Sequence, residues 1–377
     1  MIEVLRQALD AELPRAYALR RQIHEDPHVS GDEAGTRDLV LEHLPVADGI
    51  EVAGTGAIVR VGGPGPAVAI RAELDALPVV ESTGSTWASR TAGVMHACGH
   101  DVHLAATAAL AGAVARIGRP PLLVVLQPRE ETAPSGALDV LASGLLEGGR
   151  AMIGAHVQPQ LLAGTISATP GFVNASADEF TVTVHGRGGH AAYPHTLADP
   201  VGALAHIVVA LQGLPHRVAD PTSTTVLSVT RLMAGTAANV VPDTAVAAGT
   251  LRTSNDTDRR RLLDGLTGTA TAIATAHGCT ADIAVVELEP PLINDSALAA
   301  AAGSGLRDLG YTVVDDMRSA GSDDFAHYCR YLPSLMMFVG VAGGGRLHSA
   351  TFLPPDEAVR DVAYALLAGY CAGTGER

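Results

Sequence analysis

Lysine is absent from this chain of 377 residues, so every one of its 25 basic residues is an arginine. This absence excludes enzymes that need a catalytic lysine, such as those that form Schiff bases, anchor pyridoxal phosphate or use a P-loop lysine. Long apolar runs are also missing. The longest, at 104–115 and 121–126, fall short of the roughly 20 residues that cross a bilayer.

Cysteine is scarce, and its spacing predicts no disulfide framework. The four cysteines are widely separated, at Cys98, Cys279, Cys329 and Cys371, which is typical of a protein in a reducing compartment. The first 23 residues are amphipathic, with acidic residues interspersed, and lack the apolar segment of an export signal. We therefore expect a cytoplasmic protein.

Positive charge is in deficit, with a net charge of -15. This balance argues against nucleic acid or an anionic membrane as a partner, because both attract basic surfaces. The one dense basic run, 259–261, is explained better by a solvated helix face. A hydrophobic content of 47% with 17% charged residues predicts a folded chain, and its length favours two domains.

Helices and strands alternate in the first part of the chain. The sequence predicts two helices at 3–24 and 34–44, two strands at 57–63 and 67–74, a helix after His100 and a fully apolar strand at 121–127. This alternation predicts an α/β domain with a mixed, mostly parallel sheet that is flanked by helices.

The pattern changes near Ser176. Strand, helix, strand, strand, helix and strand are expected at 179–186, 200–211, 224–232, 244–253, 257–277 and 281–289. The βαββαβ order is typical of a small α+β unit. The α/β pattern then returns, with elements expected at 296–309, 311–314, 335–341 and 356–371. We therefore expect a domain at 176–289 that is inserted into a catalytic domain formed by 1–175 and 290–377.

The segment Met95–His103 contains three histidines, one cysteine and one aspartate in nine residues. Imidazole nitrogen and thiolate sulfur suit zinc and its first-row neighbours, and Gly99 lets Cys98 and His100 face one centre. The segment therefore indicates part of a metal site. The alternative is a group of buried histidines that cap a helix beginning near Asp101.

Acidic residues and histidines follow several of the expected strands, at Glu73, Asp75, Glu130, Glu131, His156 and His348. Strand ends of an open α/β sheet line its ligand crevice. Adjacent glutamates point in different directions, so one can bind a metal while the other faces a water molecule; a solvated loop is the alternative. The pattern indicates a hydrolytic metal centre, which needs scattered ligands, an open position and a base.

Seven motifs carry a family resemblance: MHACGHDVH, QPREET, GAHVQP, GRGGHAAYPH, AGTAANVVPD, GSDDF and LHSATF. In this order they resemble the aminoacylase and carboxypeptidase superfamily of dinuclear metallohydrolases. The resemblance is closest to the amidohydrolase branch, with hippurate hydrolases, N-acetyl-diaminopimelate deacetylases and indole-acetyl amino acid hydrolases. The similarity runs from IHEDPHVS to DEAV and so covers nearly the whole chain.

The resemblance implies two divalent metal ions, which could be zinc, manganese, cobalt or nickel. Their ligands would be Cys98, His100, Glu131, His156 and His348. Cys98 would take the bridging position that other branches fill with aspartate. Glu73, Ala234 and Ala350 depart from residues that are usual in the branch, where aspartate, glycine and proline are common. None of these departures removes a ligand.

The same resemblance implies roles for five further residues. Glu130 would be the general base, and Asp75 would orient a metal ligand. His190 of the inserted domain would stabilise the oxyanion in the active site of a second copy, and Asn239 and Arg252 would hold the substrate carboxylate. The inserted domain would then serve as a lid and a dimerisation domain, and the protein would be a homodimer.

The first hypothesis is a metal-dependent amidohydrolase that cleaves small N-acyl amino acids or similar amides. A dipeptidase or carboxypeptidase on the same scaffold is the second. A third makes Cys98 a thiol nucleophile, and a fourth is a catalytically silent binding protein. The silent alternative is disfavoured because all five ligands and Glu130 are present.

Overall fold

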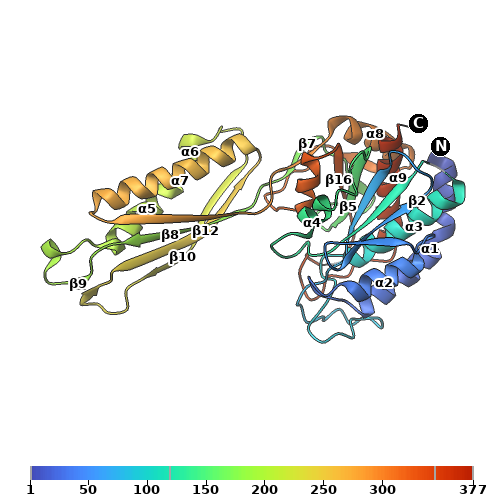
Figure 1. Ribbon diagram of the computed structural model, residues 1–377. Helices are drawn as coiled ribbons and strands as arrows, with labels where there is room; N and C mark the ends of the chain where they lie inside the picture. Colours follow the sequence, from blue (N-terminus) through green and yellow to red (C-terminus); the bar gives the residue numbers. More distant parts are fainter. Residues whose placement is uncertain (1, 119, 344, 376–377) are drawn as a thin grey trace. The chain divides into compact units, whose positions relative to one another are not determined.

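The computed structural model describes residues 2–118, 120–343 and 345–375. The chain forms two compact units, both drawn in Figure 1. The first comprises Met1–Gly171, Ile293–Met317 and Asp324–Arg377, and the second comprises Phe172–Leu292 and Arg318–Asp323. Two short strands, β7 (Gly171–Asn174) and β14 (Leu292–Asn294), lie where the chain passes from one unit to the other.

An eight-stranded sheet organises the first unit, in the order β1-β2-β4-β3-β5-β16-β6-β15. Its strands are β1 (Gly49–Val52), β2 (Gly56–Val61), β3 (Val68–Glu73), β4 (Leu122–Gln127), β5 (Ala151–Gln158), β6 (Thr165–Ser167), β15 (Thr312–Val314) and β16 (Ser334–Gly340). The four central strands β4, β3, β5 and β16 run parallel, whereas β1, β2 and β6 pair antiparallel with their inner neighbours. The central strands are apolar because both of their faces are covered.

Helices cover both faces of this sheet (Figure 1). They are α1 (Ile2–Glu25), α2 (Ala34–His43), α3 (His100–Ile117), α4 (Gly136–Ala142), α8 (Ser296–Asp308), α9 (Glu357–Thr374) and the 3-10 helix η2 (Asp324–Arg330). Neighbouring residues of β5 show the two faces. A side chain at Gly369 of α9 would meet Ile153, whereas one at Gly154 would meet Phe325 of η2. Alternate residues of a strand point to opposite faces, so α9 and η2 lie on opposite sides.

A buried ion pair joins α1 to α3. Arg20 Nε donates to Asp101 Oδ2 at 3.1 Å, and neither side chain is more than 1% exposed. His24 Nδ1 lies 3.1 Å from the same oxygen. Burial, the largest influence, raises the pKa of Asp101, but Arg20 and His24 outweigh it and hold this pKa far below its usual range. Asp101 is therefore ionised in the folded protein.

The variant Asp101→Asn should lower the free energy of unfolding by about 1–3 kcal/mol, because it removes the carboxylate that accepts from the buried Arg20 Nε, while Arg20 still pairs with Asp356. The pKa of Asp101 is lower in the folded protein than in the unfolded chain, where it is about 4. Its contribution to the free energy of unfolding is therefore complete above the unfolded-state pKa and is lost as the pH falls towards the folded-state pKa. Urea unfolding of metal-free protein at neutral and acidic pH measures both effects. Glu12→Gln is the control, since Glu12 pairs with the exposed Arg116 and should matter little. Equal stability of the two variants would show that the Asp101 contact does not stabilise the α1–α3 packing.

The second unit is a four-stranded antiparallel sheet with two helices on one face (Figure 1). The sheet order is β10-β12-β8-β13, formed by β8 (Asp178–His185), β10 (Thr225–Ala234), β12 (Thr244–Thr253) and β13 (Thr280–Glu287). Its helices are α5 (Pro200–Gln212) and α7 (Asp256–Ala276), with the short elements β9 (Gly189–His190), η1 (Pro194–Thr196), α6 (Pro215–Val218) and β11 (Val240–Val241). The chain order of the main elements is βαββαβ, as the sequence predicts. Alternate residues of β12 are buried because one face packs on the helices.

These elements confirm the expected fold class, a mixed α/β sheet with an inserted α+β unit. No helix in the described parts of the chain combines the length and the apolar character needed to cross a membrane.

Candidate metal centre

The turn before α3 presents Cys98 and His100 together. Gly99 between them has a φ of +88°, a left-handed conformation that favours glycine. A Cβ at this position would also lie 2.5 Å from the Val157 side chain. The backbone therefore requires glycine, and the sharp turn places a buried thiol and a buried imidazole side by side at the start of α3.

Side chains from three other segments of the first unit meet there. Cys98 Sγ lies 3.4 Å from His156 Nε2 and 3.3 Å from His348 Nε2. Glu131 Oε1 lies 3.4 Å from His348 Nε2 and 3.9 Å from His100 Nε2. The structure thus brings together all five residues that the resemblance implies as ligands, although they span 250 positions of the chain.

Hydrogen bonds orient two of the histidines towards this cluster. His100 Nδ1 donates to the backbone oxygen of Asp75 at 2.7 Å, and His156 Nδ1 donates to that of Val157 at 2.7 Å. The proton on Nδ1 leaves a lone pair on Nε2, the arrangement of a metal-binding histidine. His348 is held by its backbone, which has a φ of +64° and donates its N–H to Ala97. A strained backbone at a non-glycine residue is typical of a functional site.

Without a cation, the electrostatics keep His156 neutral and Glu131 ionised but leave the Cys98 thiol protonated. Burial, with His103 adding to it, lowers the pKa of His156 to about 3, so this imidazole is neutral. Burial opposes ionisation of Glu131, but His348 and His100 lower its pKa overall. Burial raises the pKa of the Cys98 thiol well above its usual value, and Glu131 and Glu130 raise it further. The thiol therefore needs a cation beside it to ionise.

These residues fit a divalent metal. Two buried atoms, His100 Nε2 and Glu131 Oε1, have no hydrogen-bond partner among the described residues. Ligand atoms of Cys98, His100 and Glu131 all lie within 4.8 Å of one another. Buried polar atoms are rarely left without a partner, and a set of sulfur, nitrogen and oxygen donors suits zinc and similar ions.

His103 lies beside the cluster, but both of its nitrogens already have partners. Its Nδ1 donates to Glu73 Oε2 at 2.9 Å, and its Nε2 accepts the Val157 N–H at 3.0 Å. His103 therefore supports the backbone next to His156 instead of binding a metal. Arg71 extends this support, since its guanidinium donates to both Glu73 and Asp324.

Glu130 and Asp75 lie at the edge of the cluster. Glu130 Oε2 is 3.9 Å from His100 Nε2, and its side chain is 13% exposed. Asp75 is buried, and its Oδ2 accepts the Glu131 N–H at 2.9 Å and the Ser30 hydroxyl at 2.7 Å. Burial raises the pKa of Asp75, although His100 and the Glu131 N–H oppose it. A carboxylate with some access to water thus lies next to a buried one that holds the backbone.

The remaining candidate residues belong to the second unit. His190 pairs with Val240 across the strands β9 and β11, and the next residue, Ala191, donates its N–H to the Asn239 oxygen at 3.0 Å. His190 and Asn239 are therefore neighbours at an exposed two-stranded antiparallel sheet. Arg252 lies half-buried on β12 and donates from Nη1 to Ser322 Oγ at 3.0 Å.

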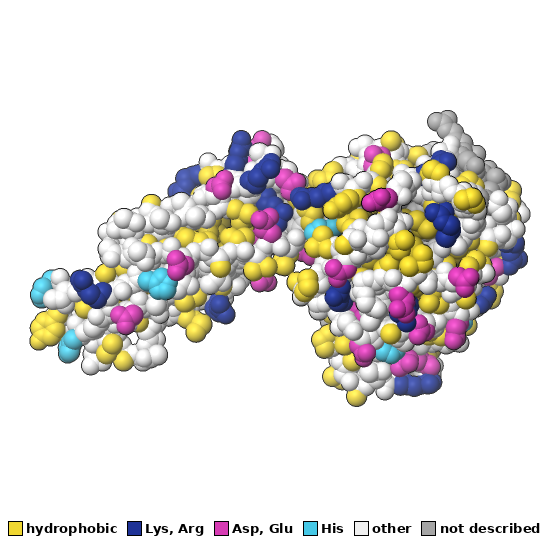
Figure 2. All heavy atoms as spheres, in the orientation of Figure 1, with side chains coloured by type: hydrophobic (Ala, Val, Ile, Leu, Met, Phe, Trp, Pro, Cys, Tyr) yellow, Lys and Arg dark blue, Asp and Glu magenta, His cyan; other side chains and the backbone are white. Residues whose placement is uncertain are grey.

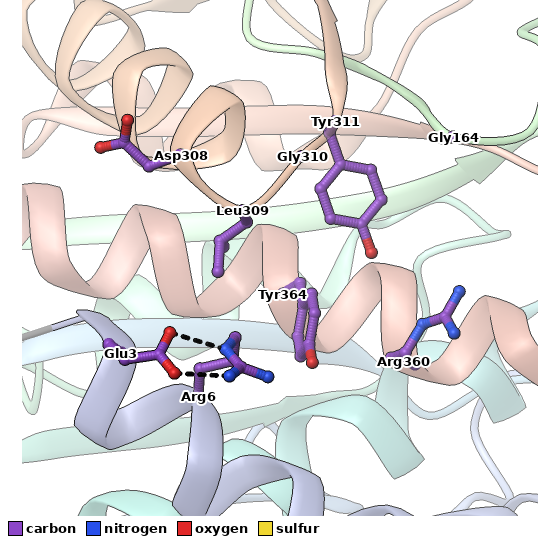
Figure 3. A pocket seen from close by; sticks show the side chains of 9 residues that line it. All are labelled: Glu3, Arg6, Gly164, Asp308, Leu309, Gly310, Tyr311, Arg360 and Tyr364. Carbon is purple, nitrogen blue, oxygen red and sulfur yellow. Dashed lines mark hydrogen bonds and ion pairs between the residues drawn. The ribbon is translucent and has the colours of Figure 1, made fainter.

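A cavity of about 430 Å³ lies elsewhere on the first unit, between α1, α8 and α9 (Figure 3). Several of its charged groups have partners of their own. Arg6 pairs with Glu3 on the same helix, α1, and Arg360 pairs with Asp361, to which the Tyr311 hydroxyl also donates. None of the candidate site residues lines it, so the cavity is separate from the metal centre.

A mostly parallel sheet with a cysteine, histidines and a glutamate clustered near its strand ends, and a further glutamate beside them, is typical of a metal-dependent hydrolase. The family model described as "Peptidase family M20/M25/M40" matches residues 69–368. The chain belongs to this family, and it is a metal-dependent amidohydrolase, as the motifs predict.

The similarity to known proteins extends over nearly the whole length of the chain. N-acetylcysteine deacetylase of Bacillus subtilis is 36% identical over 92% of this chain and 93% of its own length. N-acetyldiaminopimelate deacetylase of Bacillus cytotoxicus is 33% identical over 95% and 98%. A solved Bacillus subtilis structure, described as a dinuclear metal-binding peptidase from the M20 family, has a TM-score of 0.85 and 31% identity over 96% of this chain and 98% of that one.

Proposed function

We propose that the protein hydrolyses the amide bond of small N-acyl amino acids, with N-acetyl amino acids as the first class to test. The observation that carries this proposal is the convergence of Cys98 with four other proposed ligand side chains, with Glu130 beside them. The names of the similar deacetylases support the substrate class.

Two divalent ions would be held by Cys98, His100, Glu131, His156 and His348. Zinc, manganese, cobalt and nickel all accept such ligands. When bound, the ions would supply Lewis acidity towards the water and the amide carbonyl. His100 Nε2 and Glu131 Oε1, buried without a hydrogen-bond partner among the described residues, support this assignment.

Glu130 would act as the general base. It would take a proton from the attacking water and deliver it to the nitrogen of the leaving amine. Asp75 would fix the positions of Glu131 and His100, because its carboxylate accepts the Glu131 N–H and its backbone oxygen accepts from the His100 ring.

His190 would donate to the oxyanion of the tetrahedral intermediate, and Asn239 and Arg252 would bind the substrate carboxylate. The Ser322 hydroxyl supports the role of Arg252, because it holds one nitrogen of the guanidinium in place. A charged hydrogen bond contributes about 1.5–3 kcal/mol. We therefore expect the free carboxylate to improve KM by about 10- to 100-fold over a carboxamide.

We further propose that the protein is a homodimer formed through the second unit. β10 is an edge strand of its sheet, and Leu232 and Met233 on that strand are 55% and 60% exposed. Apolar side chains of this unit are visible at the surface in Figure 2. A cytoplasmic location is also proposed, since all four cysteines are free and Cys98 must stay reduced to bind metal.

A substrate panel with metal analysis tests the function. The panel contains N-acetyl, N-benzoyl and indole-acetyl amino acids, the carboxamides of the same compounds, and dipeptides. We expect turnover of the N-acyl amino acids, loss of turnover after chelation and its recovery on adding back metal. Faster hydrolysis of dipeptides than of every N-acyl amino acid would favour the carboxypeptidase alternative, and full activity after complete metal removal would contradict the metal mechanism.

A further inference from the structure

Glu33 is a buried carboxylate to which the sequence motifs assign no role. It lies in the loop between α1 and α2 and is 0% exposed. Its Oε1 accepts the N–H of Gly31 at 2.8 Å and that of Arg129 at 2.9 Å, and its Oε2 accepts the hydroxyl of Thr55. A buried carboxylate is costly unless hydrogen bonds satisfy it, and here these bonds come from three separate segments.

The contact with Arg129 holds a strained backbone. Arg129 has a φ of +53°, in the left-handed region that residues other than glycine rarely adopt. Such a conformation persists only where surrounding contacts enforce it. The Glu33 carboxylate supplies one such contact, from 96 positions away in the chain.

Arg129 immediately precedes Glu130, and Asp75 holds the residue on the other side. Asp75 Oδ2 accepts the Glu131 N–H at 2.9 Å. The loop that contains Glu33 also supplies the Ser30 hydroxyl, which donates to the same Asp75 oxygen at 2.7 Å. Two buried carboxylates therefore fix the backbone on both sides of Glu130, and one loop contributes to both contacts.

We propose that Glu33 is a positioning residue for Glu130, an inference that rests on the proposed role of Glu130 as the base. By holding the Arg129 N–H, Glu33 keeps the strained turn after β4 in the one conformation that directs Glu130 towards the cluster around Cys98. Without this contact the turn relaxes towards an ordinary backbone conformation. The base then moves away from the position in which it takes a proton.

Three variants test this role. Glu33→Ala removes the acceptor, and Glu33→Gln keeps an amide oxygen that can accept from Gly31 and Arg129. Thr55→Val is the matched control, because it removes a hydrogen bond from the same carboxylate but leaves the Arg129 contact in place. A displacement of about 1 Å at a reacting group lowers turnover by about 100-fold. We expect kcat to fall by about this factor in Glu33→Ala, with KM and metal content little changed.

The second measurement is hydrogen exchange of the metal-free protein, which does not depend on activity. Peptides that cover 128–136 should exchange faster in Glu33→Ala than in the wild type, whereas Glu33→Gln and Thr55→Val should resemble the wild type in both exchange and kcat. If Glu33→Ala fails to fold, Glu33→Asp replaces it, since the shorter side chain withdraws the acceptor from Arg129 and should give the same two changes.

Two results would overturn the proposal: unchanged exchange of 128–136 in the acceptor-removing variant, or a fall in kcat that Thr55→Val reproduces in full. A failure of the proposed role of Glu130 would look different from these two results. Glu130→Gln would then retain turnover, whereas Glu33→Ala would still change the hydrogen exchange of 128–136.

Discussion

Glu130→Gln is expected to lower kcat by about 10²- to 10⁴-fold, the range typical of a removed general base. Glutamine keeps the shape of the side chain and can still accept a hydrogen bond, but it cannot take a proton at neutral pH. The Glu130 carboxylate lies 3.9 Å from His100 Nε2 and is partly exposed, so a water molecule can reach it. Steady-state kinetics with an N-acetyl amino acid measure the loss.

Glu131→Gln is the natural comparison, because the two glutamates are adjacent but contact different partners. Glu131 lies 3.4 Å from His348 Nε2 within the proposed ligand set, so its replacement should lower both metal content and turnover. Glu130→Gln should keep the metal content of the wild type. Turnover retained in Glu130→Gln, or metal lost from it, would contradict the assignment of Glu130 as the base.

Much of the fold could be predicted because the central strands are fully buried and so form uninterrupted apolar runs. The segment 121–127 predicts a strand, and β4 occupies Leu122–Gln127. Short edge strands carry no such signal. β1 covers only Gly49–Val52, and three of its four residues are not buried, so its sequence resembles that of a loop.

Some residues of the candidate site could be predicted from the sequence because of their type and their spacing. Cys98 and His100 stand out because metal ligands are rare at such density, and Glu130 and Glu131 because they follow a recognisable strand. Glu33 has no comparable local signal. Its meaning depends on Arg129, which is brought beside it only by the folded chain, and neither periodicity nor composition reports a contact between a side chain and a distant backbone N–H.

His103 shows that the sequence can also suggest a ligand whose nitrogens the folded structure uses for other contacts. In the sequence it belongs to the dense group at Met95–His103 and is equally suited to binding a metal. The structure shows that the Val157 N–H occupies its Nε2 and Glu73 its Nδ1. The type of residue thus identifies candidate ligands, whereas the hydrogen bonds of the folded state select among them.

Cys98 is the residue at which the metal mechanism and the thiol mechanism predict opposite results. As a nucleophile it would need to be a thiolate in the absence of metal. Burial and the carboxylates of Glu131 and Glu130 instead raise its pKa well above the usual value. In metal-free protein near neutral pH the thiol therefore keeps its proton and is a poor nucleophile.

Cys98→Ala should weaken metal binding by at least about 100-fold, since even the loss of a residue that only supports a ligand weakens it by 10- to 100-fold, and turnover should fall with the metal. Cys98→Asp should retain metal and a measurable part of the turnover, because a carboxylate can occupy the same position between His156 and His348. Metal titration and kinetics on the two variants test this. An aspartate variant that binds metal fully but has no turnover would favour the thiol nucleophile.

The raised pKa of Cys98 also predicts the pH dependence of metal binding. Because the thiol is protonated below its raised pKa, a metal ion must displace that proton, and the affinity should rise with pH. Adding zinc to metal-free wild type near neutral pH should release more protons than adding it to Cys98→Ala, where no thiol is present. Equal proton release from the two proteins would mean that Cys98 does not ionise on binding, and the cysteine would then lose its place in the ligand set.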